Sequence, residues 1–231
     1  MKEIGLYVHI PFCRSKCLYC DFNSYECREG DSEDYVAALL RELDEYQKRY
    51  DFIYKTVFIG GGTPTVINCF LIGSILEKLS PFIMSGAEIT MESNPGTVTF
   101  ENLKYYRSLG INRLSIGLQA WQGELLRGLG RIHSPEDFLH VYDCARKSGF
   151  DNINTDLMFA LPNQTLVMWK ETLKKVAGLG MDHISCYSLI LEEGTKLYEL
   201  YREGKVQLPD EEADREMYWT AVEVLDSYRY G

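Results

Sequence analysis

One stretch near the beginning of the chain carries most of the information about its architecture and chemistry: Leu6-Tyr7-Val8-His9-Ile10-Pro11-Phe12-Cys13-Arg14-Ser15-Lys16-Cys17-Leu18-Tyr19-Cys20. Its first part, Leu6–Ile10, is an apolar run of the kind that forms a strand. The loop that follows places Cys13, Cys17 and Cys20 within eight residues. A strand that leads directly into such a loop indicates a metal-binding segment at the end of that strand.

The spacing C-x3-C-x2-C limits which group the loop can hold. A structural zinc ion usually takes four protein ligands, so it would need His9 or Cys27 as the fourth. A redox C-x-x-C pair would leave one of the three cysteines without a role. Three thiolates suit a [4Fe–4S] cluster, because they can hold three of its irons and leave the fourth open to another ligand. We therefore expect a cluster, with zinc, a redox pair and incidental thiols as alternatives.

The other four cysteines are scattered along the chain, at Cys27, Cys69, Cys144 and Cys186. The last three fall on expected helix or strand faces, so we expect them to be thiols of the core. Cys27 is the one plausible additional metal ligand among them.

The composition excludes several classes of function. Of the 231 residues, 24 are lysine or arginine and 34 are aspartate or glutamate, which gives a formal net charge of −10. This excess argues against a general affinity for nucleic acid or anionic membranes, because both need a basic face. No apolar run reaches the roughly 18 residues of a membrane span. Since Met1–Gly5 also lacks the features of a secretory signal, we expect a cytoplasmic protein.

Short strand-like runs alternate with amphipathic helical stretches along the whole chain. The expected strands are Leu6–Ile10, Thr56–Ile59, Glu88–Glu92, Arg113–Leu118, Asn152–Leu157 and His183–Leu189. The expected helices are Glu33–Arg49, Ile67–Leu79, Phe100–Ser108, Pro135–Ser148, Leu166–Ala177 and Glu211–Tyr228. The alternation predicts one α/β domain over residues 1–231 with a parallel sheet, either doubly wound or a partly closed barrel.

Local signals support the ends of these helices. Ser32, Thr99 and Ser134 stand where a side-chain oxygen can cap a helix N-terminus. Gly110 and Gly149 stand where the chain reverses after a helix. We therefore expect these five positions to mark helix boundaries.

Polar or glycine-rich residues follow several of the expected strands. They are Gly60-Gly61-Gly62-Thr63-Pro64, Glu92-Ser93-Asn94, Gln119 and Asp156. Parallel α/β folds carry their chemistry at the carboxyl ends of the strands. Several neighbouring strands that deliver such groups to one rim predict a functional site there.

The motifs together resemble a known family. The cysteine spacing, with an aromatic residue before Cys20, is the signature of radical S-adenosylmethionine (SAM) enzymes. Within them, the chain is similar to the oxygen-independent coproporphyrinogen III oxidase group over Tyr7–Cys13, Phe58–Thr65, Glu92–Pro95, Ser115–Gln119, Leu129–His133 and Asn154–Met158. The resemblance implies a partial (β/α)6 barrel of the TIM-like, radical SAM type, with its cluster at the open end.

The resemblance also implies roles for individual residues. Cys13, Cys17 and Cys20 would ligate the [4Fe–4S] cluster, and SAM would chelate its free iron. The residues expected around SAM are Tyr7, Tyr19, Gly60, Gly61, Gly62, Thr63, Glu92, Gln119, Arg131 and Asp156. Glycines without a Cβ permit close approach of backbone groups to such a ligand.

The group has two branches, oxidases and heme chaperones. The oxidases resembled here carry a further cysteine two residues after the third and a longer N-terminal extension, whereas this chain continues Cys20-Asp21-Phe22. The resemblance therefore implies a heme chaperone of the HemW type that carries heme to respiratory acceptors. Coproporphyrinogen oxidation and simple electron transfer are the alternatives, and the residues alone leave open whether the chain is an enzyme. Relatives of this kind continue into a C-terminal domain, which we expect to be missing after Gly231.

Overall fold

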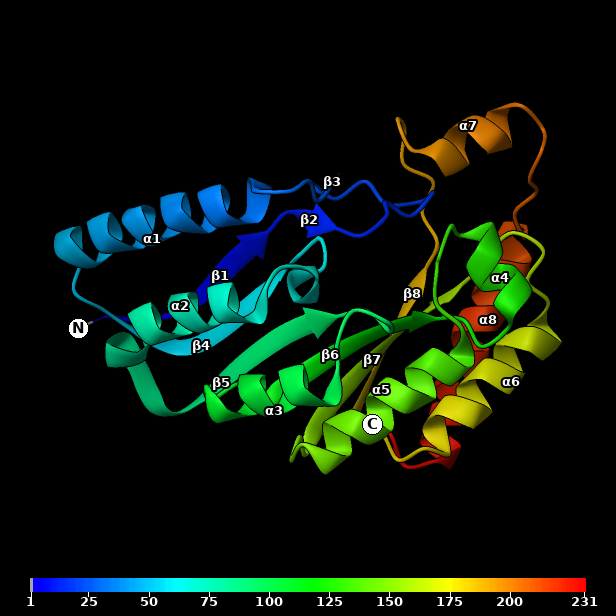
Figure 1. The fold of residues 1–231 in the computed structure, drawn as a ribbon. Helices are drawn as coiled ribbons and strands as arrows, with labels where there is room; N and C mark the ends of the chain where they lie inside the picture. Colours follow the sequence, from blue (N-terminus) through cyan, green and yellow to red (C-terminus); the bar gives the residue numbers. More distant parts are fainter. Residues whose placement is uncertain (1) are drawn as a thin grey trace.

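The computed structural model describes residues 2–231, and its centre is a six-stranded parallel sheet (Figure 1). The strands follow the chain in spatial order: β1 (Lys2–Ile10), β4 (Phe52–Gly61), β5 (Ile83–Ser93), β6 (Arg113–Gln119), β7 (Asn152–Phe159) and β8 (His183–Ser188). Every neighbouring pair is parallel. All six strands expected from the sequence are confirmed, and most of them are longer than expected at one or both ends.

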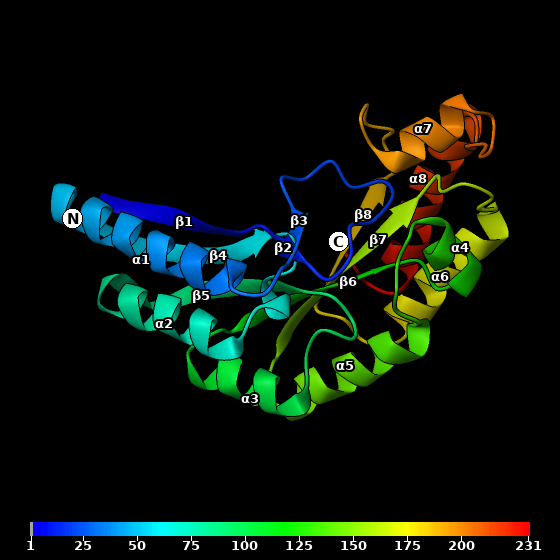
Figure 2. The same cartoon turned by 45° about the horizontal axis from the view of Figure 1, so that its top comes forward.

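Six longer helices cover one face of this sheet (Figure 2). They are α1 (Asp31–Arg49), α2 (Cys69–Leu79), α3 (Phe100–Ser108), α5 (Pro135–Lys147), α6 (Leu166–Ala177) and α8 (Glu211–Ser227). Strand residues such as Ile10, Ile59 and Leu114 are fully buried, and they form one core with apolar residues of the helices. This layer of buried apolar side chains supplies the main driving force for folding.

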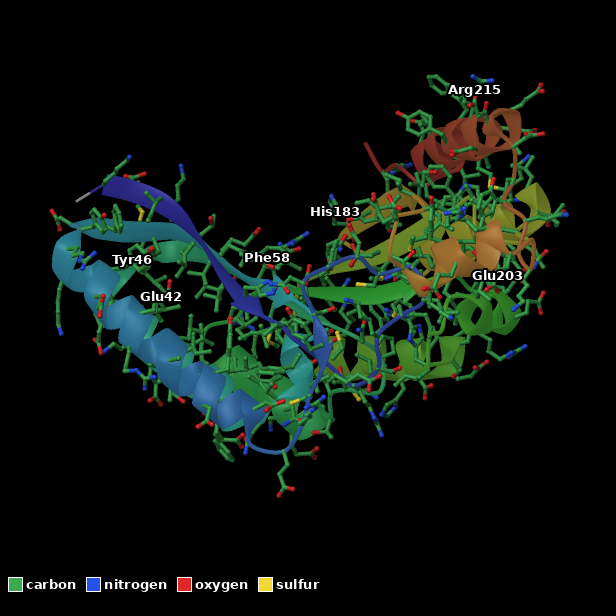
Figure 3. The ribbon with its side chains drawn as sticks, turned by 90° about the horizontal axis from the view of Figure 1, so that it is seen from above. Glu42, Tyr46, Phe58, His183, Glu203 and Arg215 are labelled. Atoms are coloured by element: carbon green, nitrogen blue, oxygen red, sulfur yellow. The ribbon has the colours of Figure 1, made fainter. Side chains whose placement is uncertain are left out.

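The sheet bends into an open half-barrel instead of staying flat. Viewed from above, the molecule is a crescent with α1 at one end and α8 at the other (Figure 3). Within residues 2–231, β1 and β8 are the two edges of the sheet and do not pair. A doubly wound sheet would carry helices on both faces, so the partial (β/α)6 barrel is confirmed.

The helix boundaries test the predicted caps. Thr99 and Ser134 both form capping boxes, with Asn102 and Asp137 as their partners. The prediction for Ser32 was wrong, because α1 begins at Asp31 after Gly30, which adopts φ 84° and caps without a side chain. Gly110 (φ 99°) and Gly149 (φ 86°) follow their helices in the left-handed conformation, as expected.

Short elements that the sequence did not predict close the mouth of the half-barrel. They are β2 (Phe12–Cys13), β3 (Tyr25–Glu26), α4 (Gly123–Gly128) and α7 (Lys196–Arg202), together with the 3-10 turn Pro64–Val66; a second 3-10 turn, Ser80–Phe82, precedes β5 at the opposite end of the strands. Leu18 donates its N–H to the Leu129 carbonyl, and its own carbonyl accepts from the Leu197 N–H. Residues after α4 and at the start of α7 therefore hold the cysteine loop from the far side of the barrel.

None of the helices in residues 2–231 combines the length and apolar character needed to cross a membrane. Among the scattered cysteines, Cys144 is buried in the main core, whereas Cys69 and Cys186 are half-buried against it. Cys27 is half-buried beside the cysteine loop, where its N–H donates to the Cys13 carbonyl.

Candidate functional site

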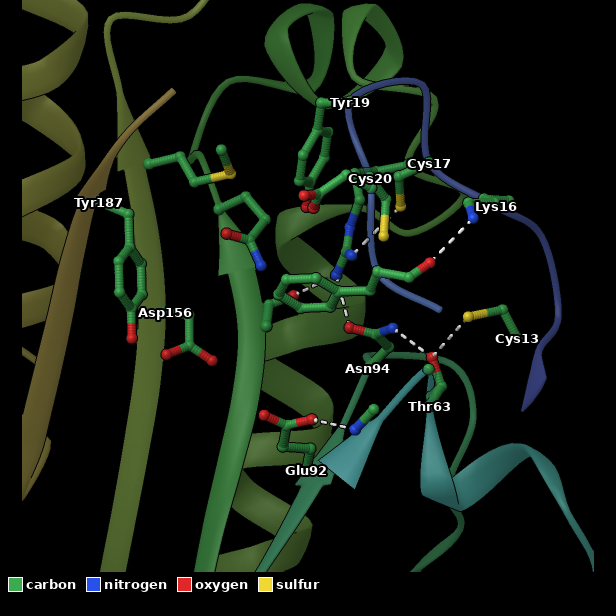
Figure 4. A pocket seen from close by; sticks show the side chains of 18 of the residues that line it. Cys13, Lys16, Cys17, Tyr19, Cys20, Thr63, Glu92, Asn94, Asp156 and Tyr187 are labelled. Carbon is green, nitrogen blue, oxygen red and sulfur yellow. Dashed lines mark hydrogen bonds between the residues drawn. The ribbon is translucent and has the colours of Figure 1, made fainter. Parts of the chain in front are cut away.

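A cavity of about 450 Å³ opens at the carboxyl ends of the strands, under the cysteine loop (Figure 4). All three loop cysteines line it. So do most of the residues that the sequence placed around SAM, namely Tyr19, Gly61, Gly62, Thr63, Glu92, Gln119, Arg131 and Asp156. Residues of β4, β5, β6, β7 and β8 thus meet the cysteine loop in one place, as the rim of a parallel barrel requires.

The cysteine loop is a closed loop with a paired base. β2 and β3 pair at that base, where the Tyr25 N–H donates to the Pro11 carbonyl at 2.7 Å. Inside the loop, the Lys16 ammonium donates to the carbonyls of Phe22 (3.0 Å) and Ser24 (3.1 Å). These bonds gather the loop around Lys16 while Cys13, Cys17 and Cys20 face the cavity.

The glycine turn after β4 lies against the beginning of this loop. The Gly62 N–H donates to the Ile10 carbonyl at 2.8 Å, and the Thr63 N–H donates to the Phe12 carbonyl at 2.7 Å. A Cβ on Gly62 would stand 2.5 Å from the Phe12 carbonyl oxygen and 3.0 Å from the Cys13 sulfur. No residue with a side chain fits there unless the Cys13 segment moves.

Two half-buried carboxyl groups, those of Glu92 and Asp156, lie deeper in the barrel. Glu92, at the end of β5, accepts a hydrogen bond from the Gly61 N–H at 3.1 Å. Burial raises the pKa of Glu92 to about 7, and the nearby Asp156 adds to this. Asp156 accepts from the Ser115 hydroxyl (2.9 Å) and from the Asn154 amide (3.0 Å). These carboxyl oxygens give the cavity floor acceptors for an amine or hydroxyl.

Arg131 is the cation of the cavity wall beneath the loop. It donates to the Cys17 sulfur at 3.5 Å, and to the Gly117 carbonyl and the Asn94 side-chain oxygen at 2.6 Å each. Burial raises the pKa of Tyr19 far above its usual range even though Arg131 opposes the shift. Tyr19 is therefore a neutral phenol in this wall.

Gln119 ends β6 in the left-handed region, with φ 72°. The pairing of β6 with β7 shifts its register between Gly117 and Gln119. A non-glycine residue in this region carries backbone strain, and such strain tends to gather at functional sites. Here it accompanies a buried side chain that lines the cavity.

Two residues predicted around SAM do not line the cavity. Tyr7 is 55% exposed, donates to His9 Nδ1 at 3.0 Å and stacks against Phe58. Gly60 lies behind Glu92, since a Cβ there would come within 2.8 Å of the carboxyl oxygen. The structure therefore places Tyr7 beside the site. Gly60 leaves the space that the Glu92 carboxyl group occupies.

The two histidines next to the motifs have ordinary partners. His9 bonds the Asn23 carbonyl through Nε2 at 2.9 Å while Nδ1 accepts from Tyr7. His133 is buried and bonds the Leu118 carbonyl through Nε2 at 3.2 Å. Burial lowers the pKa of His133 to about 4, and the Arg131 charge adds to that shift. Both imidazoles therefore have hydrogen-bond partners within the fold.

Sequence analysis did not assign a role to Asn94 or Ser115, although both line the cavity. Asn94 bonds Arg131 and Thr63, and Ser115 bonds Asp156. The only signal was their position, Asn94 just past β5 and Ser115 within a quoted motif. Neither residue type points to a ligand when read alone.

The residues fit a cluster better than a single metal ion. Within residues 2–231, no three His, Cys, Asp or Glu side chains converge on a point that one ion could occupy, whereas zinc needs ligands at about 2.3 Å from one centre. Three free thiols instead border a wide cavity, which suits a group that brings its own iron and sulfide. The glycine turn leaves the room beside Cys13 that such a group needs.

Comparisons with known proteins agree with this arrangement. The model of the radical SAM superfamily matches residues 7–176. The chain is 35% identical to the heme chaperone HemW of Bacillus subtilis over 96% of its length, and 37% identical to the mitochondrial radical S-adenosyl methionine domain-containing protein 1 of Danio rerio over 97%. It spans 60% and 51% of these two relatives.

Among solved structures, coproporphyrinogen III oxidase (HemN) from Escherichia coli superimposes with a TM-score of 0.90 at 29% identity, over all of this chain and 54% of that one. The family match covers well over half of the chain, and its cysteines border the cavity at the rim of the half-barrel. The chain belongs to the radical SAM superfamily and is similar to its HemW and HemN members.

Proposed function

We propose that this protein is a heme chaperone of the HemW type that carries a [4Fe–4S] cluster and binds SAM. One observation carries the proposal: the three loop thiols border the same cavity as the glycine turn and the carboxyl groups of Glu92 and Asp156. Relatives named heme chaperones, 34–40% identical to this chain, support the choice among radical SAM functions.

In this proposal Cys13, Cys17 and Cys20 hold the cluster. Gly61 and Gly62 let a ligand come close to the backbone, and the carboxyl oxygens of Glu92 and Asp156 accept its hydrogen bonds. The side chains of Gln119 and Arg131 enclose it from the other wall. A bound, reduced cluster would supply one-electron chemistry to a SAM molecule held by these residues.

Heme, or a porphyrin, is the proposed cargo, and a respiratory protein in the same compartment is the proposed acceptor. The cytoplasm is the proposed location. We also propose that residues 1–231 form the radical SAM core; the two relatives that it matches over 60% and 51% of their length are longer.

Oxygen-independent coproporphyrinogen oxidation is a second candidate, favoured by the close superposition on HemN. The two functions differ in what they consume. An oxidase forms 5′-deoxyadenosine in step with loss of porphyrinogen carboxylates, whereas a chaperone binds heme and releases it to an acceptor without decarboxylation.

The first experiment is anaerobic reconstitution with iron and sulfide, followed by low-temperature EPR of the reduced protein with and without SAM. We expect a [4Fe–4S]⁺ signal that SAM shifts, lost in Cys13→Ser and kept in the control Cys144→Ser, whose thiol is buried in the core. Heme titration and coproporphyrinogen turnover then separate the two candidates. A signal that survives Cys13→Ser but is lost with Cys27→Ser contradicts the proposed ligand set.

A further inference from the structure

We infer that Asn94 is a positioning residue that directs hydrogen bonds onto two of the three cluster cysteines. Asn94 directly follows the last residue of β5 and is half-buried. The inference rests on the proposed cluster, but it concerns a residue that makes no contact with any cysteine itself.

A continuous chain of hydrogen bonds runs through Asn94 (Figure 4). On one side, its amide nitrogen donates to Thr63 Oγ1 at 2.8 Å, and that hydroxyl donates to the Cys13 sulfur at 3.8 Å. On the other side, its amide oxygen accepts from Arg131 at 2.6 Å, and the same guanidinium donates to the Cys17 sulfur at 3.5 Å. The chain therefore joins two loop sulfurs through one amide.

The direction of each bond follows from the chemistry of the groups. A guanidinium has only donors, so the Asn94 oxygen must face Arg131 and its nitrogen must face Thr63. Thr63 Oγ1 then accepts from that nitrogen. The single hydroxyl hydrogen of Thr63 is thereby left for the Cys13 sulfur. An amide at position 94 thus orders both donors, which neither a carboxylate nor an apolar residue can do.

A second observation shows that the barrel keeps room for this arrangement. A Cβ on Gly117 would lie 2.8 Å from the Asn94 amide oxygen and 3.1 Å from the Arg131 guanidinium. Arg131 also donates to the Gly117 carbonyl at 2.6 Å. Because Gly117 lacks a side chain, Arg131 and Asn94 can meet beneath the loop.

Hydrogen bonds to the sulfurs of a cluster and net charge nearby both set its reduction potential. Asn94→Asp keeps an acceptor for Arg131 but adds negative charge, and its carboxylate competes with Cys13 for the Thr63 hydrogen. Asn94→Ala removes both bonds and adds no charge. Both changes make the reduced cluster less favourable, and the effect of the aspartate is the larger.

The test is a redox titration of the reconstituted protein followed by EPR, with iron and sulfide content measured for every variant. We expect a more negative midpoint potential in Asn94→Asp and a smaller shift of the same sign in Asn94→Ala. Asn112→Ala is the matched control, because Asn112 is also half-buried and its amide bonds Ile89 and Ala87 of β5, at the opposite end of the strands. Its potential stays that of the wild type.

A double variant makes the test sharper. Thr63→Val removes the bond to Cys13 that Asn94→Asp weakens by competing for the Thr63 hydrogen, so the shifts of the two changes combine to less than their sum. Unchanged potentials in folded, fully loaded Asn94 variants overturn the inference, as does unfolding of both Asn94 variants while Asn112→Ala folds. Absence of a cluster in the wild type overturns the proposed function instead.

Discussion

The two halves of the rim are built in opposite ways. On the side of β1, β4 and β5, the site is shaped by missing side chains, since the turn at Gly61 and Gly62 packs its backbone directly against the segment that leads to Cys13. On the side of β6 and β7, it is shaped by the long polar side chains of Gln119, Arg131 and Asp156. One half positions the cysteines through the backbone and the other encloses the cavity with functional groups.

The backbone conformations of the two halves show the same contrast. Gly61 has φ 117°, and a Cβ there would meet His9 Nδ1 at 2.6 Å, so only glycine fits. Gln119 has φ 72° but keeps a buried side chain in the cavity. Backbone strain is present at Gln119, where the cavity uses the side chain. It is absent at Gly61, where the site needs only space.

The largest effect is expected from adding a side chain to the glycine turn and, in the other half, from removing the side chain of Gln119. Gly62→Ala pushes a Cβ against the Phe12 carbonyl oxygen, and such overpacking costs about 1–3 kcal/mol. Displacement of the Cys13 segment also abolishes cluster assembly. Gln119→Gly relieves strain and raises the free energy of unfolding by about 1 kcal/mol, while the cluster still assembles. Iron content measures cluster assembly, and urea unfolding measures the free energy of unfolding. Equal cluster yields in Gly62→Ala and Gln119→Gly contradict the proposed difference between the two halves.

The carboxyl group of Glu92, in the first half of the rim, increases the free energy of unfolding of the protein at acidic pH. Its pKa is about 7 in the fold against 4.5 as a free group, so the folded state holds a proton that the unfolded chain releases between these values. This stabilisation is full below pH 4.5 and is lost as the pH rises through 7. It amounts to roughly 3 kcal/mol at its largest.

Glu92→Gln removes this contribution from the iron-free protein. Urea unfolding between pH 4.5 and 7.5 is expected to show stability rising more steeply with pH in the variant than in the wild type. Parallel curves for the two proteins contradict a raised pKa at Glu92.

The buried imidazole of His133, in the second half of the rim, has the opposite effect on the pH dependence of stability. Its pKa is about 4 in the fold against 6.5 as a free group. The unfolded chain therefore binds a proton that the fold excludes, and the stability from neutral His133 is lost as the pH falls from 6.5 through 4. His133→Gln is expected to flatten the acid limb of the same urea series. If the stability of His133→Gln falls with decreasing pH as steeply as that of the wild type, the lowered pKa of His133 is contradicted.

The smallest effect concerns the outer helices of the two halves. Ser134 caps α5 on the second half through the N–H of Asp137, and Ser134→Ala is expected to lower the free energy of unfolding by about 1 kcal/mol. Ser32 lies inside α1 on the first half, where its hydroxyl donates to the neighbouring Glu33 and caps no helix N–H. Ser32→Ala is expected to change thermal stability little. If Ser32→Ala loses more stability than Ser134→Ala, the conclusion that Ser134 caps its helix and Ser32 does not is contradicted.

Part of the site was predictable because its signals are local. The six strands, the two capping boxes and the cysteine loop each depend on residues a few positions apart. The residues around α4 and α7 that hold Leu18, and the contacts of Asn94 with Thr63 and Arg131, join segments far apart in the chain. No periodicity or spacing reports such contacts. The resemblance put Tyr7 around SAM, whereas its exposed side chain bonds His9 and does not line the cavity.

The cysteine spacing, the strand–helix alternation and the glycine turn were enough to predict a cluster loop at the rim of a parallel α/β sheet, because each arises from neighbouring residues. The tertiary structure selected an open half-barrel over a doubly wound sheet, since that depends on which face the helices cover. It also brought Asn94 between two sulfur-bonding donors. Hydrogen bonds between distant segments exist only once the sheet has brought three strands to a common rim.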